Sequence, residues 1–184
     1  MTSVTGLLRH LLAIAAFPFV MAVVIPVWLA RRYDVTARNE VTDVSLVGHI
    51  ASVLGVIAGA SLVLLGLFLF VHSLRRFATE GEGTLAPWDP PRNLVVRGPY
   101  RFVRNPMISG VLLVLVGVAL YLSSVPHALW ALTFFGINAV YIPLFEEPQL
   151  KRRFGASYIE YCKHVPRLVP RLRPWQPVPL RPIQ

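Results

Sequence analysis

Long apolar blocks constrain the fold of this chain more than any other feature of its sequence. Four of them stand out, at residues 7–30, 44–74, 106–122 and 126–144. A helical crossing of a bilayer takes roughly 20 apolar residues, with a lower limit of about 17, and each block reaches that limit. Since 55% of the residues are hydrophobic and only 15% are charged, the sequence predicts an all-α integral membrane protein with about four transmembrane helices.

The first block shares with secretory signal peptides a basic residue, Arg9, just before an apolar run. Its run is longer than the apolar core of a usual signal peptide, and Trp28 stands where a cleavage site needs a small residue. We therefore expect a retained helix.

Basic residues are distributed unevenly between the connections. Of the 18 Lys and Arg residues, 15 lie at the start of the first block (Arg9), between residues 75 and 105, or after the last block, and the other three lie between residues 31 and 43. The positive-inside rule then predicts a multi-pass protein whose termini and second connection are cytoplasmic. As partners we expect membrane lipids and no nucleic acid.

We divide the chain into four regions. Residues 1–75 hold the first two transmembrane helices, and residues 76–105 form a cytoplasmic connecting loop. Residues 106–170 hold a C-terminal hairpin and a cytoplasmic helix, and residues 171–184 form a proline-rich tail. Glycines and prolines in the loop argue against regular helix there, which leaves an ordered cap and a flexible linker as alternatives. The tail is expected to be extended or disordered.

Three further patterns predict how the helices pack and end. Ser123, Ser124 and Val125 alone separate the last two blocks, so these blocks should form a tight helical hairpin. Small residues recur in the second block and predict close helix packing; they are Ala51, Gly55 and Gly59. After the hairpin, apolar residues follow helical spacing and predict an amphipathic helix that ends at Pro166; they are Leu150, Phe154, Tyr158, Tyr161 and Val165.

Cysteine and histidine give little support for a metal site. Cys162 is the single cysteine, so an internal disulfide is excluded, and we expect a small buried residue there. The five histidines lack the spacing of metal ligands. We expect no metal.

The first candidate site lies at the start of the third block. Asn105 is a good N-cap, and Pro106 suits the first helical position. Arg101 and Arg104 are three residues apart and would be neighbours if residues 99–105 form a short helix. They are either anchors at the membrane surface or, together with the free N–H groups of the next helix, an anion site.

The second candidate site is the pair Glu146 and Glu147, which follows the fourth block without a polar spacer. Carboxylates at such a position are costly unless they reach water, a cation or a donor. The short hairpin should bring them near Arg104 and Asn105. A pocket with both signs of charge would suit a zwitterion that carries an extra positive charge.

These two motifs resemble those of the isoprenylcysteine carboxyl methyltransferase and phospholipid methyltransferase superfamily of membrane proteins. The matching stretches are GPYRFVRNPMISG, which ends at Gly110, and EEPQLKRRFGASYIEYCKHVPRLVP, which starts at Glu146. The resemblance implies S-adenosylmethionine as methyl donor, bound in a cytoplasmic pocket, and a lipophilic acceptor that enters from the bilayer. A zwitterion with a sulfonium agrees with the charges of the two candidate sites.

The resemblance also implies roles for single residues. Arg104, Glu146 and Glu147 would be catalytic, and the donor would be bound by Tyr100, Arg104, Asn105, Pro106, Glu146, Glu147, Tyr158, Tyr161 and Arg167. The chain departs from the pattern at Asn105, where the eukaryotic enzymes have histidine. Ile108 and Ser109 replace the usual aromatic region.

The acceptor implied by the resemblance is the carboxylate of a prenylated, isoprenylcysteine-like substrate, which needs no general base. The alternative acceptor is a phospholipid or other lipid amine, and Glu146 or Glu147 would then be the candidate base. A protein of another class, a non-catalytic membrane protein for assembly or anionic lipid binding, is also consistent with the basic face. A nucleotide-dependent reductase is disfavoured because no Gly-x-Gly-x-x-Gly follows a strand.

Overall fold

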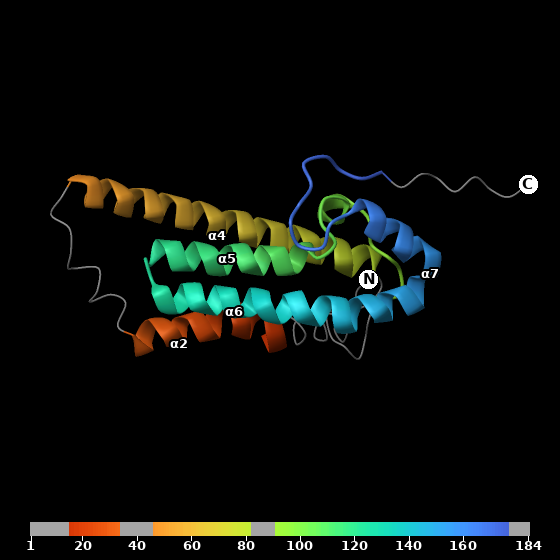
Figure 1. The fold of residues 1–184 in the computed structure, drawn as a ribbon, viewed down its shortest axis with the longest axis horizontal. Coiled ribbons are helices and arrows are strands. Elements are labelled where there is room, and N and C mark those ends of the chain that lie inside the picture. Colours follow the sequence, from red (N-terminus) through yellow and green to blue (C-terminus); the bar gives the residue numbers. More distant parts are fainter. Residues whose placement is uncertain (1–14, 34–45, 82–90, 177–184) are drawn as a thin grey trace, which may run out of the picture.

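The computed structural model describes residues 15–33, 46–81 and 91–176. Within these residues all regular structure is helical, which confirms the all-α prediction. Long helices lie side by side along the molecule, and shorter elements gather at one end (Figure 1). The helix expected from residue 7 is described only from residue 15 onward, and residues 82–90 and 177–184 also lie outside the description.

The first described helix begins as a π-helix, η1 (Ala15–Val24), and continues as α2 (Ile25–Arg32). In the π register the carbonyl of Met21 would bond the N–H of residue 26, which is a proline and has none. The Trp130 indole N–H donates to that carbonyl at 3.1 Å instead. The buried ring of His127 contacts the Pro26 carbonyl through Nε2 at 3.1 Å and Ser124 Oγ through Nδ1 at 2.7 Å. These polar contacts join the first helix to α6.

Helix α4 runs from Leu46 to Glu80. Its 35 residues give a length of about 52 Å at 1.5 Å per residue, so it exceeds the ~30 Å hydrocarbon core of a bilayer. The predicted end at Leu74 is wrong by more than a turn. Arg76 donates to Glu80 at 2.9 Å across one turn. This ion pair stabilises helix over residues 76–80, which we expected to belong to the connecting loop.

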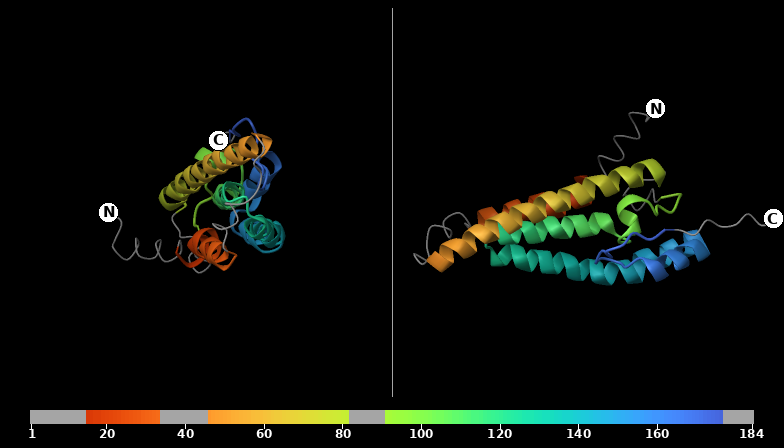
Figure 2. Two further views of the ribbon diagram at one scale, coloured as in Figure 1. Left: turned by 90° about the vertical axis from the view of Figure 1, so that its left-hand side faces the viewer. Right: turned by 90° about the horizontal axis from the view of Figure 1, so that it is seen from above.

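Helix α5 (Pro106–Tyr121) lies between α4 and α6, as the end-on view shows (Figure 2). Glycines make its contact with α4 very close. A Cβ on Gly66 would lie 2.6 Å from the Gly110 carbonyl oxygen, and a Cβ on Gly59 would lie 2.6 Å from that of Gly117. We call these four glycines the glycine seam. The predicted close packing of small residues therefore holds at Gly59, whereas Ala51 is exposed. On α4 the seam continues seven residues after Gly59, at Gly66.

Leu122, Ser123 and Ser124 connect α5 to the antiparallel helix α6 (Val125–Tyr141), so the connection is as short as expected. The end of the fourth block is not the end of the helix. The chain continues through a π turn, η3 (Ile142–Glu146), into α7 (Glu147–His164). The π turn accommodates Pro143, which cannot donate to the preceding turn.

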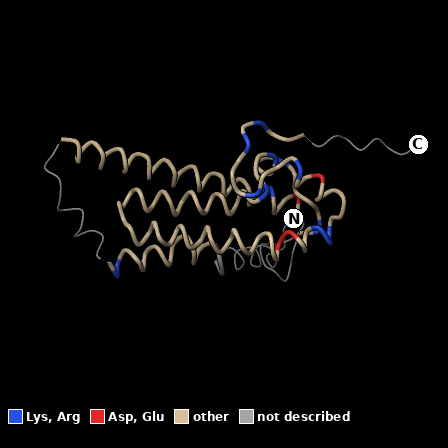
Figure 3. Tube along the Cα trace, viewed as in Figure 1, with Lys and Arg blue, Asp and Glu red and all other residues tan. Residues whose placement is uncertain are grey.

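Among the described residues, two helical stretches are long and apolar enough to cross a membrane, Leu46–Glu80 and Val125–His164, and Pro106–Tyr121 is a shorter apolar helix. The count of four spans and the cytoplasmic orientation stay predictions. Charged residues of the described chain gather mainly at the end that holds α7, with a small basic group at the end of α2 (Figure 3).

Residues after α7 fold back over the start of α5. We call residues 166–176 the strap. The N–H groups of Arg104 and Asn105 donate to the carbonyls of Pro166 and Arg167, at 2.8 and 3.2 Å. Further along, Arg171 and Trp175 donate from the backbone to Phe102 and Arg101. Of the two expected states of the tail, extended or disordered, disorder is therefore wrong for the described part, which these bonds hold in place.

Candidate functional site

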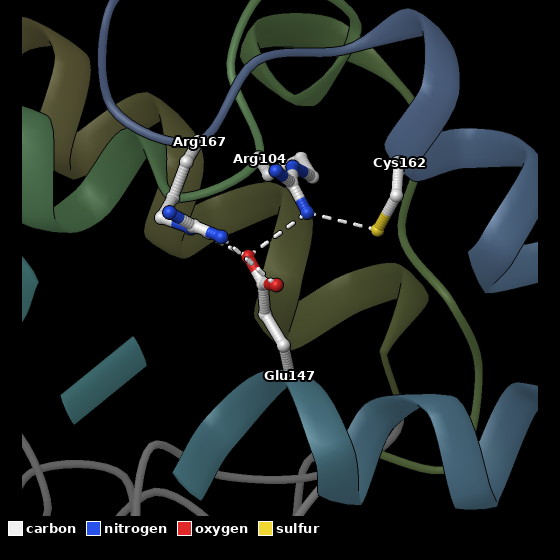
Figure 4. Close-up of polar contacts among 4 residues, drawn as sticks. All are labelled: Arg104, Glu147, Cys162 and Arg167. Carbon is white, nitrogen blue, oxygen red and sulfur yellow. Dashed lines mark hydrogen bonds and ion pairs between the residues drawn. The ribbon is translucent and has the colours of Figure 1, made fainter. Parts of the chain in front are cut away.

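Glu147 is the centre of a cluster of charges at the polar end of the molecule (Figure 4). Its carboxylate accepts from Arg104 Nη1 at 2.9 Å and from Arg167 Nε and Nη2 at 2.6 and 3.1 Å. Only 5% of Glu147 is exposed. A carboxylate so buried requires cationic partners, and here it has two.

Each member of this cluster comes from a different element. Arg104 ends the segment before α5, Glu147 begins α7, and Arg167 lies on the strap. The backbone bonds between residues 104–105 and 166–167 place the two arginines beside each other. The structure thus brings the two sequence motifs together, as the hairpin argument predicts, and places Arg167, from the end of the second motif, beside Glu147.

Arg101 does not join Arg104. The predicted short helix over residues 99–105 is only a single 3-10 turn, η2 (Gly98–Arg101), so the two side chains do not share a face. Arg101 Nε instead donates to the Trp175 carbonyl at 2.7 Å and holds the strap. The predicted anion site with two neighbouring arginines is therefore wrong in its geometry.

Asn105 and Pro106 begin α5, as predicted. The Asn105 side chain makes no capping hydrogen bond; its carbonyl accepts from the N–H of Ser109 at 3.0 Å. Ser109 Oγ is 3.1 Å from that carbonyl and 3.0 Å from the Leu168 carbonyl. These two residues shape the junction between α5 and the strap, and within the described chain neither forms a hydrogen bond with Glu147.

Tyr158 and Tyr161 belong to a buried cluster with Val165, and Leu150 and Phe154 pack against it. This confirms the predicted apolar face of α7. The Tyr161 hydroxyl donates to the Tyr100 carbonyl at 2.6 Å, which ties α7 to η2. Gly155 interrupts the helix at φ 54° and ψ −130°.

Two buried polar atoms of the site have no hydrogen-bond partner in the described chain: the Tyr100 hydroxyl and Arg104 Nε. Such atoms are rare in folded proteins and call for an explanation. Burial raises the pKa of the Tyr100 phenol, and the charges of Tyr161, Glu146 and Glu80 raise it further. The phenol therefore keeps its proton at neutral pH and is available as a donor.

Cys162 and Trp175 are parts of the site that the sequence reasoning missed. Arg104 Nη1 contacts Cys162 Sγ at 2.8 Å, so this half-buried cysteine is more than an inert core residue. The Trp175 ring stacks on His164 with ring centroids 5.6 Å apart and lies 5.7 Å from Tyr161. Cys162 lies four residues after Tyr158, so helical spacing could have placed it beside Tyr158 on the same face of the helix. No pattern in the sequence indicated that Trp175 belongs to the site.

Glu146 and Glu147 lie at the junction of η3 and α7, and their surroundings differ. Glu146 is half-buried and forms no ion pair with any described residue. The hydrogen bonds that Glu147 accepts also raise the pKa of Arg167 above its usual value, so Arg167 stays charged. Among the described residues, no three His, Cys, Asp or Glu side chains cluster as metal ligands.

These features define a helical protein of the membrane type, with a buried site of both charge signs where three chain segments meet. Residues 54–157 match the family described as phospholipid methyltransferase, which is more than half of the chain. The chain belongs to this family.

Two curated relatives match shorter stretches. The chain is 38% identical over 78 residues to protein-S-isoprenylcysteine O-methyltransferase B of Arabidopsis thaliana, covering 42% of this chain and 39% of the relative. It is 40% identical over 76 residues to methanethiol S-methyltransferase 2 of Bradyrhizobium diazoefficiens, covering 40% of this chain and 27% of the relative. The chain therefore matches less than half the length of either relative. No solved structure matches it.

Proposed function

We propose that this protein is a membrane methyltransferase that uses S-adenosylmethionine to methylate a lipophilic acceptor. Family membership and the names of both relatives support methyl transfer. The observation that carries the proposal is the convergence of Arg104 and Arg167 on buried Glu147, next to the unsatisfied Arg104 Nε and Tyr100 hydroxyl.

The residues of the site fit the charged end of such a donor. S-adenosylmethionine supplies an electrophilic methyl group on a sulfonium, and its methionine part carries a carboxylate and an ammonium. Arg104 has a free Nε–H that suits the carboxylate, and Tyr100 has a free hydroxyl. Glu147 suits the ammonium, while Tyr158 and Tyr161 supply buried walls beside it.

Arg167 occupies one side of Glu147 in this structure, so the ammonium of a donor would compete with it. Its side chain is 38% exposed, whereas that of Arg104 is 11% exposed. Arg167 can therefore turn toward solvent at a lower desolvation cost than Arg104. We assign Arg104 to permanent binding and Arg167 to closure of the site by the strap. Asn105 and Pro106 hold the start of α5 against that strap.

The acceptor is proposed to be lipophilic and to enter from the bilayer. The carboxylate of a prenylated substrate is the acceptor that the resemblance implies, and a lipid amine is the alternative. The names of the two relatives add that acceptors on oxygen and on sulfur occur among similar proteins. The proposed orientation places the donor site and both termini in the cytoplasm.

Donor binding tests this function directly. Titration calorimetry on the purified full chain in detergent should show saturable binding of S-adenosylmethionine. Arg104→Ala and Glu147→Gln should each weaken binding by about 10-fold to 100-fold, the loss expected for one charged hydrogen bond. Glu160→Gln is the matched control, because within the described chain this exposed glutamate of α7 pairs only with Lys163 and His164, and it should bind normally. Absence of saturable binding, or equal binding by all variants, contradicts the proposal.

A non-catalytic, lipid-binding protein would behave differently. The basic residues at the polar end favour this second candidate. It predicts that Arg92→Ala and Arg97→Ala, both at exposed positions, reduce binding to anionic vesicles while no variant affects a methyl donor. Loss of donor binding at Arg104 and Glu147 alone decides for the methyltransferase.

A further inference from the structure

Residues 100–105 form a short segment that carries both unsatisfied donors of the site. The Tyr100 hydroxyl lies at its start and Arg104 Nε near its end, and neither atom has a partner in the described chain. This segment holds only the end of a single 3-10 turn, and α5 begins after it, at Pro106. Its backbone groups therefore need partners from elsewhere if the two donors are to be fixed.

The C-terminal part of the chain supplies those partners. The carbonyls of residues 100, 101 and 102 accept, in this order, from the Tyr161 hydroxyl at 2.6 Å and from the N–H groups of Trp175 and Arg171 at 2.9 and 3.0 Å. The N–H groups of residues 104 and 105 donate to the carbonyls of residues 166 and 167. The path of the segment is thus set by α7 and the strap.

Arg101 and Trp175 are joined by two hydrogen bonds. The Trp175 N–H donates to the Arg101 carbonyl at 2.9 Å, and Arg101 Nε donates back to the Trp175 carbonyl at 2.7 Å. The second bond comes from a charged guanidinium, which makes it stronger than a bond between neutral groups. We call this pair of residues the clasp. It joins the end of the strap to the segment between the two free donors.

The ring of Trp175 anchors the clasp on α7. It stacks on His164 with the ring planes 12° apart, and its centroid lies 5.7 Å from that of Tyr161. Aromatic pairs at such distances are favourable beyond the area that they bury. Tyr161 also donates to the Tyr100 carbonyl, so Trp175 and Tyr161 together hold two neighbouring residues of the segment against α7.

We propose that Arg101 and Trp175 are positioning residues of the donor site, which hold the segment so that Tyr100 and Arg104 bind the carboxylate of the donor. This inference rests on the methyltransferase function proposed above. The clasp acts through the placement of the Tyr100 hydroxyl and Arg104 Nε and has no part in the chemical step. Placement matters because a hydrogen bond weakens steeply as its angle departs from linearity.

The test compares S-adenosylmethionine with its decarboxylated form, which keeps the sulfonium and the ammonium and lacks the carboxylate. Titration calorimetry on the full chain in detergent measures both dissociation constants. The unchanged protein should prefer the intact donor by about 10-fold or more, as expected for a charged hydrogen bond. Arg101→Ala and Trp175→Ala should each remove most of this preference, because they weaken binding of the intact donor and leave binding of the decarboxylated donor unchanged.

Conservative variants and a matched control accompany the two alanine variants. Arg101→Lys keeps a cationic donor, and Trp175→Phe keeps the backbone bonds and an aromatic ring, so each should recover most of the preference. Arg173→Ala is the control, because this strap arginine is exposed and forms no hydrogen bond or ion pair with a described residue. It should match the unchanged protein. Both clasp residues lie outside the long apolar helices, and thermal unfolding checks that the variants stay folded.

The ratio of the two dissociation constants separates positioning from a merely structural role, which would weaken both donors equally. Equal weakening by the alanine variants overturns the proposal, and so does an unchanged preference. Equal affinity of the unchanged protein for both donors also overturns it and leaves a donor site that does not recognise the carboxylate. Absence of saturable binding of either donor refutes the underlying function instead.

Discussion

The glycine seam and the polar end of the molecule are built in opposite ways. Along the seam, α4 and α5 approach through backbone atoms, and no space is left for even one methyl group. At the polar end, long side chains from two other segments converge on Glu147, and two buried polar atoms have no partner among the described residues. The contrast teaches that the seam serves as a rigid support, while the polar end retains bonding capacity for a ligand.

The largest effect should come from adding volume to the seam. In Gly66→Ala the new Cβ would lie 2.6 Å from the Gly110 carbonyl oxygen and 2.9 Å from the Val114 nitrogen. Backbone cannot yield as a side chain does, so we expect a loss of about 3 kcal/mol, the upper end for overpacking. Thermal unfolding in detergent measures it. Donor affinity of the folded fraction should stay constant, and a selective loss of affinity would contradict the separation of the two regions.

Gly136→Ala is the matched control for the seam. Gly136 lies within α6, and nothing lies within 4 Å of an added Cβ. Alanine should therefore leave the unfolding midpoint unchanged or raise it, through a helix preference of about 1 kcal/mol.

A smaller effect should follow from Tyr161→Phe, which tests the polar end. The change removes the hydrogen bond to the Tyr100 carbonyl and leaves a buried acceptor unpaired, at a cost of about 1–3 kcal/mol. Because this bond joins α7 to η2, donor affinity should fall together with the unfolding midpoint. If calorimetry shows unchanged affinity, the position of Tyr100 does not matter to the donor.

The most local effect should come from Gly155→Ala. Gly155 has φ 54° and ψ −130°, a backbone conformation that side chains rarely adopt, and open space around it, so the cost is backbone strain alone, about 1–3 kcal/mol. Thermal unfolding should register a small decrease, and donor affinity should hold if the two parts of α7 keep their angle. A large loss of affinity would show that this bend positions Tyr158 and Tyr161.

Local signals predicted the parts of the structure that depend on neighbouring residues. Asn105 and Pro106 marked the start of α5, and the apolar spacing from Leu150 to Val165 marked the buried face of α7. The proximity of Arg104 to Glu147 followed from the short hairpin connection. Each of these depends on periodicity or on chain connection, which a sequence carries directly.

Two kinds of feature could not be predicted in the same way: contacts between residues far apart in the sequence, and helical segments that continue where the local sequence argues against helix. The helix passes Pro143 because a π turn absorbs the missing N–H, and Arg76 with Glu80 extends α4 into an apparent loop. The strap is held by backbone bonds, such as Arg104 to Pro166, and these have no periodicity. The bonds of the strap place Arg167 beside Glu147. Arg101 binds the strap at Trp175 and so does not join Arg104.

The strap also dictates when the site is completed during synthesis. Arg104 is made before either of its partners, since Glu147 follows 43 residues later and the strap follows after α7. All the long apolar helices are thus available for membrane insertion while the charged site still lacks its closing residues. A chain that stops before Pro166 keeps its apolar bundle and lacks Arg167, so the order of translation delays closure of the proposed donor site until the bundle has been made.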